Sequence, residues 1–295
     1  MLPSLLITFR ETLEAALVVG IVLGYLARVG QARHKKVVAL GVAVGVAASV
    51  LGALLFHWLA AGFTGRAEEI FEGVTMLLGA ALLTTMILWM MRQSRVAAKL
   101  EERVAEELSE AHRLGLFALV FVAVLREGVE TVIFLGAASF AAGGSSLVGA
   151  VAGILAAVLL GYAIFMGSLK VSLKRFFAVT NVLLILFAAG LVAYGLHELQ
   201  EAGVVPVVIE HVWDINPSPQ AGGRYPLLHE DGYLGSILKG LFGYNGDPSL
   251  LEVVSYLGYL LLVATLWRIL GGKADLQGPG DARGQSAGRL EKTGI

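Results

Sequence analysis

The 295-residue sequence contains no cysteine, and charged residues are scarce. Without cysteine the chain cannot form disulfides, thiolate metal sites or a cysteine nucleophile, although this absence leaves the redox compartment open. Only 15% of the residues are charged and 57% are apolar, whereas an average soluble domain is about 25% charged and about 45–50% apolar. So few charges cannot cover a water-facing surface of this size. The composition therefore excludes a soluble enzyme, and the net charge of −1 argues against a nucleic-acid partner.

Long apolar runs are abundant instead. A helix that crosses a bilayer core of about 30 Å needs about 20 mainly apolar residues. The runs are continuous rather than alternating, which predicts helices and not the strands of a barrel. We expect an all-α membrane protein with seven transmembrane helices. The predicted spans are roughly residues 2–27, 37–61, 70–91, 116–140, 147–169, 176–196 and 251–270, with an outer loop at 197–250 and a disordered tail at 271–295.

Basic residues indicate the direction of the spans. Of the 22 Lys and Arg residues, 17 fall in one alternating set of turns and in the tail, while the opposite turns hold only Arg66, Arg224 and Lys239. Positive residues mark the cytoplasmic side of a membrane protein. The N-terminus is therefore predicted to lie outside and the C-terminus inside. The two remaining basic residues, Arg10 and Arg126, fall within the first and fourth spans.

Those two arginines begin the same motif, R-E-x-x-E, at residues 10–14 and 126–130. The first span runs inward and the fourth runs outward. Spans one to three and four to six are therefore candidate inverted repeats, with the seventh span added. Transporters built from inverted repeats hold their cargo near the bilayer midplane, at the interface of the repeats.

Six charges inside two apolar helices need compensation. Insertion scales assign a cost of about 2.5–3.5 kcal/mol to each charged residue at the centre of a membrane helix. Glu11 and Glu14 are three residues apart and share a helix face, while Arg10 and Glu14, four apart, can form an ion pair. Two such helices face to face would present four carboxylates and two guanidiniums, which suits a multivalent cation bound by oxygen. A pair of salt bridges that only locks the two spans together is the other interpretation.

Paired R-E-x-x-E motifs in the first and fourth of seven spans resemble the oxidase-dependent iron permeases, a family that includes the fungal high-affinity iron permeases and the bacterial EfeU-type iron transporters. The resemblance extends to about Arg268 and includes residues 69–73, 197–203 and 243–249. It implies import of iron, as Fe2+ or Fe3+, across the cytoplasmic or plasma membrane, without an organic cofactor. The implied iron ligands are Glu11, Glu14, Glu127 and Glu130, with Arg10 and Arg126 as ion-pair partners.

The same resemblance implies a partner, namely an extracytoplasmic oxidase, peroxidase or iron-binding protein. The chain departs from the family at Thr12, where glycine is common and where the second motif has Gly128. This difference puts the packing around Glu11 in question but leaves the charged pattern intact.

Several other residues are candidates for secondary roles. A negative vestibule concentrates cations, so acidic and histidine residues near the predicted outer surface are candidates for an ion entrance or relay, unless they are ordinary solvated side chains. These residues are Glu69, Glu72, His197, Glu198 and Glu201. Met86 and Met90 share a helix face, but we expect them in the core rather than on a soft metal. We expect packing contacts from the glycine pairs Gly20–Gly24, Gly41–Gly45 and Gly149–Gly153.

Three alternatives stay open at this stage. Carboxylates alone do not select iron, so a transporter of manganese, zinc or another divalent cation fits the same motifs. An intramembrane di-iron enzyme would usually supply Glu-x-x-His pairs, and no histidine falls in the spans that carry the motifs. A seven-helix receptor would share the topology but would not explain two buried R-E-x-x-E motifs.

Overall fold

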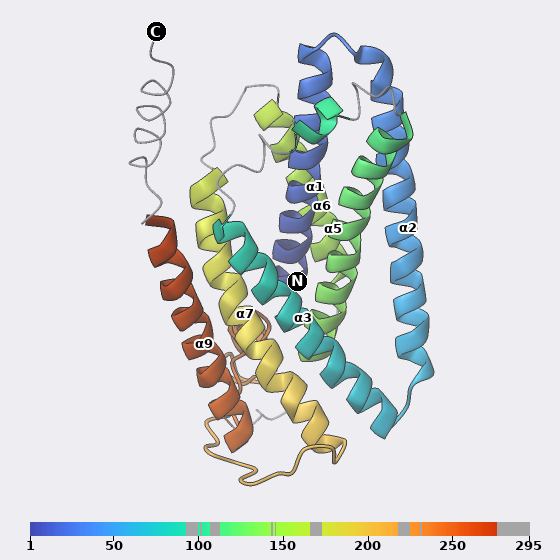
Figure 1. Ribbon diagram of the computed structural model, residues 1–295. Helices are drawn as coiled ribbons and strands as arrows, with labels where there is room; N and C mark the ends of the chain where they lie inside the picture. The colour runs from blue at the N-terminus through green and yellow to red at the C-terminus, as the bar shows by residue number, and fades with distance from the viewer. Residues whose placement is uncertain are drawn as a thin grey trace.

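A computed structural model describes residues 1–92, 100, 102–106, 113–142, 144, 146–165, 173–217, 225–230 and 232–275. These residues form a bundle of long helices (Figure 1). The helices are α1 (Leu2–Arg28), the short 3-10 helix η1 (Ala32–His34), α2 (Lys35–Gly62), α3 (Arg66–Arg92), α5 (Arg113–Ala141), α6 (Leu147–Phe165), α7 (Leu173–Glu201), α8 (Tyr233–Phe242) and α9 (Leu250–Asp275).

The prediction of an all-helical membrane protein is confirmed in the described part of the chain, which contains no strand. Five of its helices are long and apolar enough to cross a membrane, and they lie in α2, α3, α6, α7 and α9. The helices α1 and α5 are as long, at 27 and 29 residues, but each carries the three charges of its R-E-x-x-E motif. In the part of the chain that the structure describes, each predicted span falls on one long helix, although residues 166–169 of the fifth span lie outside the described residues. The number of crossings and their direction stay predictions.

The predicted ends of two spans need correction. α7 continues to Glu201, so His197, Glu198 and Glu201 belong to its last turns and not to the predicted outer loop. These turns pack on the beginning of α3, where the backbones of Gly73 and Gly195 meet, and this contact explains the additional helix. α9 likewise continues to Asp275, and the rest of the predicted tail, residues 276–295, lies outside the described residues.

Glycine seams hold α1 against α6 and α2 against α5. A methyl group at Gly153 of α6 would collide with the α1 backbone, and one at Gly45 of α2 would lie 3.0 Å from Val124 Cβ of α5. Small residues allow this close approach of two helices. The packing role predicted for the glycine pairs is thus confirmed at Gly41–Gly45 and Gly149–Gly153, whereas Gly24 has nothing within 4 Å. Each seam joins the first helix of one predicted repeat to the second helix of the other.

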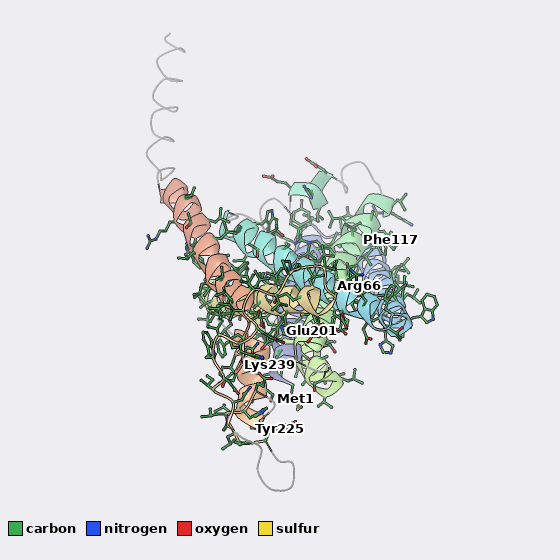
Figure 2. All side chains as sticks on the ribbon, turned by 90° about the horizontal axis from the view of Figure 1, so that it is seen from below. Met1, Arg66, Phe117, Glu201, Tyr225 and Lys239 are labelled. Atoms are coloured by element: carbon green, nitrogen blue, oxygen red, sulfur yellow. The ribbon has the colours of Figure 1, made fainter. Side chains whose placement is uncertain are left out.

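The remaining helices cover the far side of α1 and α5. α3 packs on α7, and α9 packs on α7 at one edge of the bundle, opposite α2 (Figure 1). The short helix α8 lies against the beginning of α1, where a methyl group at Gly240 would lie 2.9 Å from Pro3. In the view from below, the segment with Tyr225 and Lys239 lies beside Met1 (Figure 2).

Two hydrophobic clusters fill the bundle on either side of the charged motifs. The four-helix cluster joins α1, α3, α5 and α7; its buried members are Ile7, Met76, Ala80, Leu83, Met86, Ile87, Phe134, Ala137, Ala138, Ala141, Leu184, Phe187, Ala188, Leu191 and Tyr194. The linker-side cluster joins α1, α2, α5 and the segment between α3 and α5; its buried members are Val22, Leu26, Val38, Val104, Leu116, Val120 and Val124. On α1 and α5 the motifs lie between these clusters.

Replacing Gly153 by alanine should destabilise the bundle, because the added methyl group would overlap the α1 backbone at Leu5 and Phe9. Overpacking of this kind costs about 1–3 kcal/mol. Gly52→Ala is a matched control within α2, since nothing lies within 4 Å of that position. There the helix propensity of alanine should stabilise by up to about 1 kcal/mol. Thermal unfolding of the detergent-purified protein measures both shifts, and equal shifts would contradict the close α1–α6 seam.

Candidate metal centre

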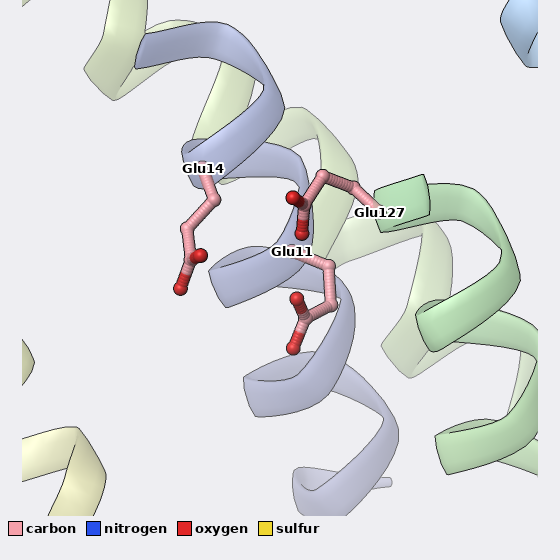
Figure 3. A group of neighbouring side chains, drawn as sticks. All are labelled: Glu11, Glu14 and Glu127. Carbon is pink, nitrogen blue, oxygen red and sulfur yellow. The ribbon is translucent and has the colours of Figure 1, made fainter. Parts of the chain in front are cut away.

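The two R-E-x-x-E motifs meet where α1 and α5 lie side by side. Single carboxylate oxygens of Glu11, Glu14 and Glu127 all lie within 4.8 Å of one another. Figure 3 shows these three side chains, two from α1 and one that reaches toward α1 from α5. Glu11 and Glu127 are buried and Glu14 is largely buried. Two helices that are distant in sequence thus place three carboxylates in one interior group.

Arg10 is the buried counter-charge of this group. Its Nη1 donates a hydrogen bond to Glu11 Oε1 at 2.6 Å, and its Nη2 makes an ion pair with Glu14 Oε1 at 2.8 Å. Nη2 also contacts the sulfur of Met86 on α3. A guanidinium has five N–H donors in a rigid fork, so it can serve several acceptors at once. The side chain is only 1% exposed, and Met86, which we expected in the core, is buried there and also contacts the site.

Arg126 occupies the equivalent place in the second motif but is far more open. Its Nε donates to Glu130 Oε1 at 2.7 Å, one helical turn along α5. Its guanidinium lies 5.4 Å from the ring centre of Trp89 in the last turn of α3, within range of a cation–π contact. The side chain is 46% exposed, against 1% for Arg10. The two motifs therefore have the same sequence pattern but different surroundings.

Glu130 pairs with Arg126 and is not part of the group of three carboxylates. The structure thus brings together three of the four predicted ligands and places the fourth on the same buried face of α5 as Glu127. Among the described residues, the Oε2 atoms of Glu11, Glu127 and Glu130 are buried and have no hydrogen-bond partner. A buried acceptor without a donor costs about 1–3 kcal/mol. A cation between the helices would remove that cost.

The difference between Thr12 and Gly128 has a packing explanation. A methyl group at Gly128 would overlap the Ser49 side chain of α2, so the second motif has no room for a larger residue. Thr12 is only half-buried. On the α1–α6 seam, Thr8 meets Gly153 and Ala16 meets Gly161. The charged pattern of the first motif is therefore compatible with threonine at this position.

The chemistry available to the group is that of oxygen ligands. If ionised, the three carboxylates and Arg10 carry a formal charge of −2. Carboxylates prefer hard cations, and helical bundles with inward-facing glutamates also hold iron and manganese. The arrangement therefore suits a divalent or trivalent metal cation and offers no thiolate.

A second acidic group lies where the beginning of α3 meets the end of α7. Glu72, Glu198 and Glu201 are close enough to repel one another, and Glu69 contributes to the same field. His197 lies 3.3 Å from Glu201 Oε1 through Nε2 and 3.3 Å from Glu252 Oε2 through Nδ1. The structure thus gathers the five residues predicted for an ion entrance at one end of the bundle, apart from the motif carboxylates.

Glu252 is a buried acid beside this group that the sequence analysis did not single out. It lies in the first turn of α9, is 2% exposed and accepts hydrogen bonds from Asn245 Nδ2 and from the backbone N–H of Ser249. Ser249 Oγ in turn accepts from the N–H of Glu252, which completes a capping box. The signal was present as Ser249-x-x-Glu252 before an apolar run. Its pairing with His197 joins α9 to α7.

The segment before α9 is tied to the preceding loop. The backbone N–H of Val212 donates to Pro248 and that of Ile215 donates to Gly246. His211 Nδ1 lies 2.8 Å from Asp247 Oδ1, and this hydrogen bond raises the pKa of the exposed His211 ring above its ordinary value. The predicted outer loop is therefore held near the second acidic group by both backbone and side-chain contacts.

Comparisons with known proteins identify close relatives. A family model described as "Iron permease FTR1 family" matches residues 1–273. The chain is 34% identical over 265 residues to the "Ferrous iron permease EfeU" of Yersinia pestis, covering 88% of this chain and 91% of that one. It is 32% identical over 265 residues to the protein of the same name from Escherichia coli O6:H1, with 88% and 93% coverage. An uncharacterized protein of Archaeoglobus fulgidus is 33% identical over 264 residues, with 88% and 92% coverage. No solved structure matches the chain.

The unequal burial of Arg10 and Arg126 predicts that their removal changes the stability of the protein by different amounts. Removing one partner of a buried ion pair costs about 3–5 kcal/mol, whereas exposed pairs contribute about 0–1 kcal/mol. Arg10→Met should therefore lower the thermal stability of the purified protein strongly, because Glu11 and Glu14 lose their buried counter-charge. Arg126→Met, the same change in the second motif, should have a much smaller effect. Equal losses in the two variants would contradict the asymmetric surroundings described above.

Proposed function

The chain belongs to the iron permease FTR1 family, and on that premise we propose that it imports iron across the cytoplasmic membrane through the paired R-E-x-x-E motifs. The relatives from Yersinia pestis and Escherichia coli carry the name ferrous iron permease, which favours iron as the cargo. As a permease, the protein moves its substrate and does not transform it.

One observation carries the site assignment. Glu11, Glu14 and Glu127 come from two helices and converge in the bundle interior, with single carboxylate oxygens of all three within 4.8 Å of one another. Buried oxygens on Glu11, Glu127 and Glu130 find no donor among the described residues. Two helices joined only by salt bridges would not need these additional acceptors. We therefore propose Glu11, Glu14, Glu127 and Glu130 as the iron ligands and Arg10 and Arg126 as their counter-charges.

The helices α1 and α5 each carry the three charges of an R-E-x-x-E motif. Charged residues are rare inside membrane-spanning helices. The charges of Glu11, Glu14, Glu127 and Arg10 face the interior between α1, α5 and α3. Arg126, which is 46% exposed, pairs with Glu130 and lies on Trp89 of α3. We infer that both helices can cross the membrane at an acceptable cost. The two glycine seams support the inverted repeat. The first helix of one repeat, α1, packs on the second helix of the other, α6, and α5 packs on α2 in the same way. A twofold axis between the repeats would relate these two pairs to each other. Together with the basic residues on one side, this arrangement supports seven crossings with the N-terminus outside and the C-terminus inside.

The second acidic group is the proposed entrance. Glu69, Glu72, Glu198 and Glu201, with His197, lie at the extracytoplasmic ends of α3 and α7 in this orientation. Their negative field would raise the local concentration of cations. An extracytoplasmic oxidase, peroxidase or iron-binding protein is the partner expected to deliver iron there. An inside-negative potential would assist import by roughly 2.3 kcal/mol per charge per 100 mV.

Iron-55 uptake tests the site. Cells that express Glu14→Gln or Glu130→Gln should take up iron at least about tenfold more slowly than cells with the natural chain at equal protein levels, because an amide neither carries charge nor binds the cation as strongly. Glu102→Gln is the matched control, since Glu102 is an exposed acid of the segment between α3 and α5. Unchanged uptake in both site variants would refute the assignment.

The position of the metal provides an independent check on that result. In a metal-soaked crystal, anomalous scattering at the iron edge should show iron between α1 and α5. Iron found only beside His197 and Glu201 would mean that the motifs lock the helices and do not bind cargo.

Competition by other metals separates iron from the alternative cargoes. If the permease is tuned to iron, a tenfold excess of manganese or zinc should reduce iron-55 uptake by less than about half, since affinity at an oxygen site also depends on geometry and availability. Cells that express the Glu14→Gln variant give the background, which is the iron-55 uptake that does not pass through the proposed site. Stronger inhibition by manganese than by unlabelled iron would favour a manganese transporter.

A further inference from the structure

A cavity of about 510 Å³ lies between α7, α8, α9 and the loop before α8, apart from the motif carboxylates. Both α8 and α9 pack on α7, and α7 and α9 lie side by side at one edge of the bundle (Figure 1). The walls include residues 193–194 of α7, the end of α8 and the first two turns of α9. Pockets of about 300–1,000 Å³ are typical of ligand sites. The cavity therefore has the size of a binding site, at the level where the predicted spans 176–196 and 251–270 meet the outer loop.

Aromatic side chains form much of the cavity wall. They come from all four surrounding segments, and they are Tyr194, Trp213, Phe242, Tyr244 and Tyr256. Tyrosine and tryptophan are enriched where a membrane meets water, because their rings have an apolar body and a polar tip. The wall thus has the composition of a surface at the edge of the bilayer.

The tyrosine hydroxyls of this wall already have partners inside the protein. The Tyr194 hydroxyl donates to the carbonyl oxygen of Tyr244 at 2.6 Å. The Tyr256 hydroxyl donates to the carbonyl oxygen of Phe242 at 2.8 Å, and that of Tyr244 donates to Leu228 at 3.1 Å. These rings therefore offer carbon, and not a waiting hydroxyl, to a ligand.

The other polar groups of the wall are paired in the same way. Glu252 Oε1 accepts from Asn245 Nδ2 at 2.8 Å, and its Oε2 accepts from the backbone N–H of Ser249 at 2.7 Å. Asn245 Oδ1 accepts from the backbone N–H of Asp247 at 2.9 Å. A sugar, a nucleotide or a hydrated cation would have to break these bonds, and a buried polar group left without a partner is costly. The cavity therefore favours an apolar ligand over the metal cargo.

One wall of the cavity continues into the outer surface of α9. Leu257 lines the cavity and is nevertheless 55% exposed. Val254 and Leu261 lie on the same helix face and are exposed as well. Since α9 is long and apolar enough to cross a membrane, this face meets the acyl chains of the bilayer. An acyl chain can enter the cavity along it without crossing water.

A positive charge lies next to the apolar wall. The Lys239 ammonium lies 5.5 Å from the ring centre of Tyr194, within range of a cation–π contact. Lys239 makes no ion pair with any residue that the structure describes. It is also one of the three basic residues in the turns predicted to lie outside. An ammonium beside an apolar cavity matches a molecule with an anionic head and an apolar chain.

We propose that this cavity binds one acyl chain of a phospholipid from the extracytoplasmic leaflet, with the lipid phosphate beside Lys239. The proposal uses the orientation given above only to name the leaflet, and it does not depend on the cargo. A bound chain fills the space between α8 and α9 and holds α9 against α7. Glu252 contacts His197 of the second acidic group at this place, so the lipid supports the proposed entrance.

Tryptophan fluorescence tests the contact, because Trp213 lines the cavity and the chain has only four tryptophans. The detergent-purified chain with Trp58, Trp89 and Trp267 changed to phenylalanine is titrated with phosphatidylglycerol that has brominated acyl chains. Quenching of Trp213 should saturate near roughly one lipid per protein, as expected for a formed pocket. A chain that keeps Trp58 alone is the control, since this ring is 71% exposed on α2. Equal lipid requirements of the two rings would overturn the proposal.

A variant that fills the cavity tests its role in the Trp213-only chain. Val253→Phe adds bulk to the wall and should raise the half-saturating lipid concentration at least about tenfold, because the chain loses its space. Val254→Phe, the same change at the exposed neighbour, should leave that concentration unchanged. If thermal unfolding shows that Val253→Phe is unfolded, Leu257→Glu at the exposed rim replaces it, since a charge there excludes an acyl chain. Unchanged binding in the folded variant would overturn the proposal.

Lys239→Gln tests the head of the lipid. It should raise the half-saturating concentration of brominated phosphatidylglycerol about fivefold, the contribution of one lysine near an anionic lipid. Binding of a brominated diacylglycerol, which has the same chains and no phosphate, should not change. An equal effect on both lipids would overturn the phosphate contact.

Lipid binding and iron transport are measured separately. The titrations contain no iron, and Glu14→Gln in the Trp213-only chain should bind lipid as the natural motif does. Failure of lipid binding therefore overturns this proposal and not the iron site. Unchanged iron-55 uptake in Glu14→Gln and Glu130→Gln refutes the iron site and not the lipid.

Discussion

The pairing of Arg10 with Glu11 and Glu14 is the constraint on which the rest of the structure depends. Three charges within two turns of α1 cannot face lipid, so the helix must be surrounded by protein or by an ion pathway. The structure meets this requirement by placing α6, α5 and α3 around α1. Arg10 pairs with both glutamates, while Glu11 Oε2 has no hydrogen-bond partner among the described residues. The helix is thus stable in the interior and still able to bind a cation.

The glycine seams make that enclosure possible. Gly153 and Gly161 bring α6 onto α1, and Gly41 and Gly45 bring α2 onto α5. Since each seam connects the two predicted repeats, neither repeat can separate from the other without exposing charge. This interlocking explains how two motifs far apart in sequence come to share one site.

Much of the candidate site could be predicted because charge in an apolar helix is a local signal. Arg10, Glu14, Arg126 and Glu130 were expected as ion pairs at a spacing of four, and these pairs are present. Glu252 was overlooked, although its capping box with Ser249 is visible in the sequence, because a single acid at the beginning of a span looks like ordinary capping. Its contact with His197 depends on how α9 packs on α7, which no local pattern encodes.

By itself, the sequence determined the helical class, the long apolar segments, the repeated motif and the family, because hydropathy and motif spacing are properties of neighbouring residues. Only the tertiary structure decided that Glu11, Glu14 and Glu127 converge while Glu130 pairs with Arg126. It also decided that two identical motifs differ in exposure, with Arg10 buried and Arg126 open. The physical reason is that burial and convergence arise from contacts between helices, and identical motifs acquire different environments when different helices surround them.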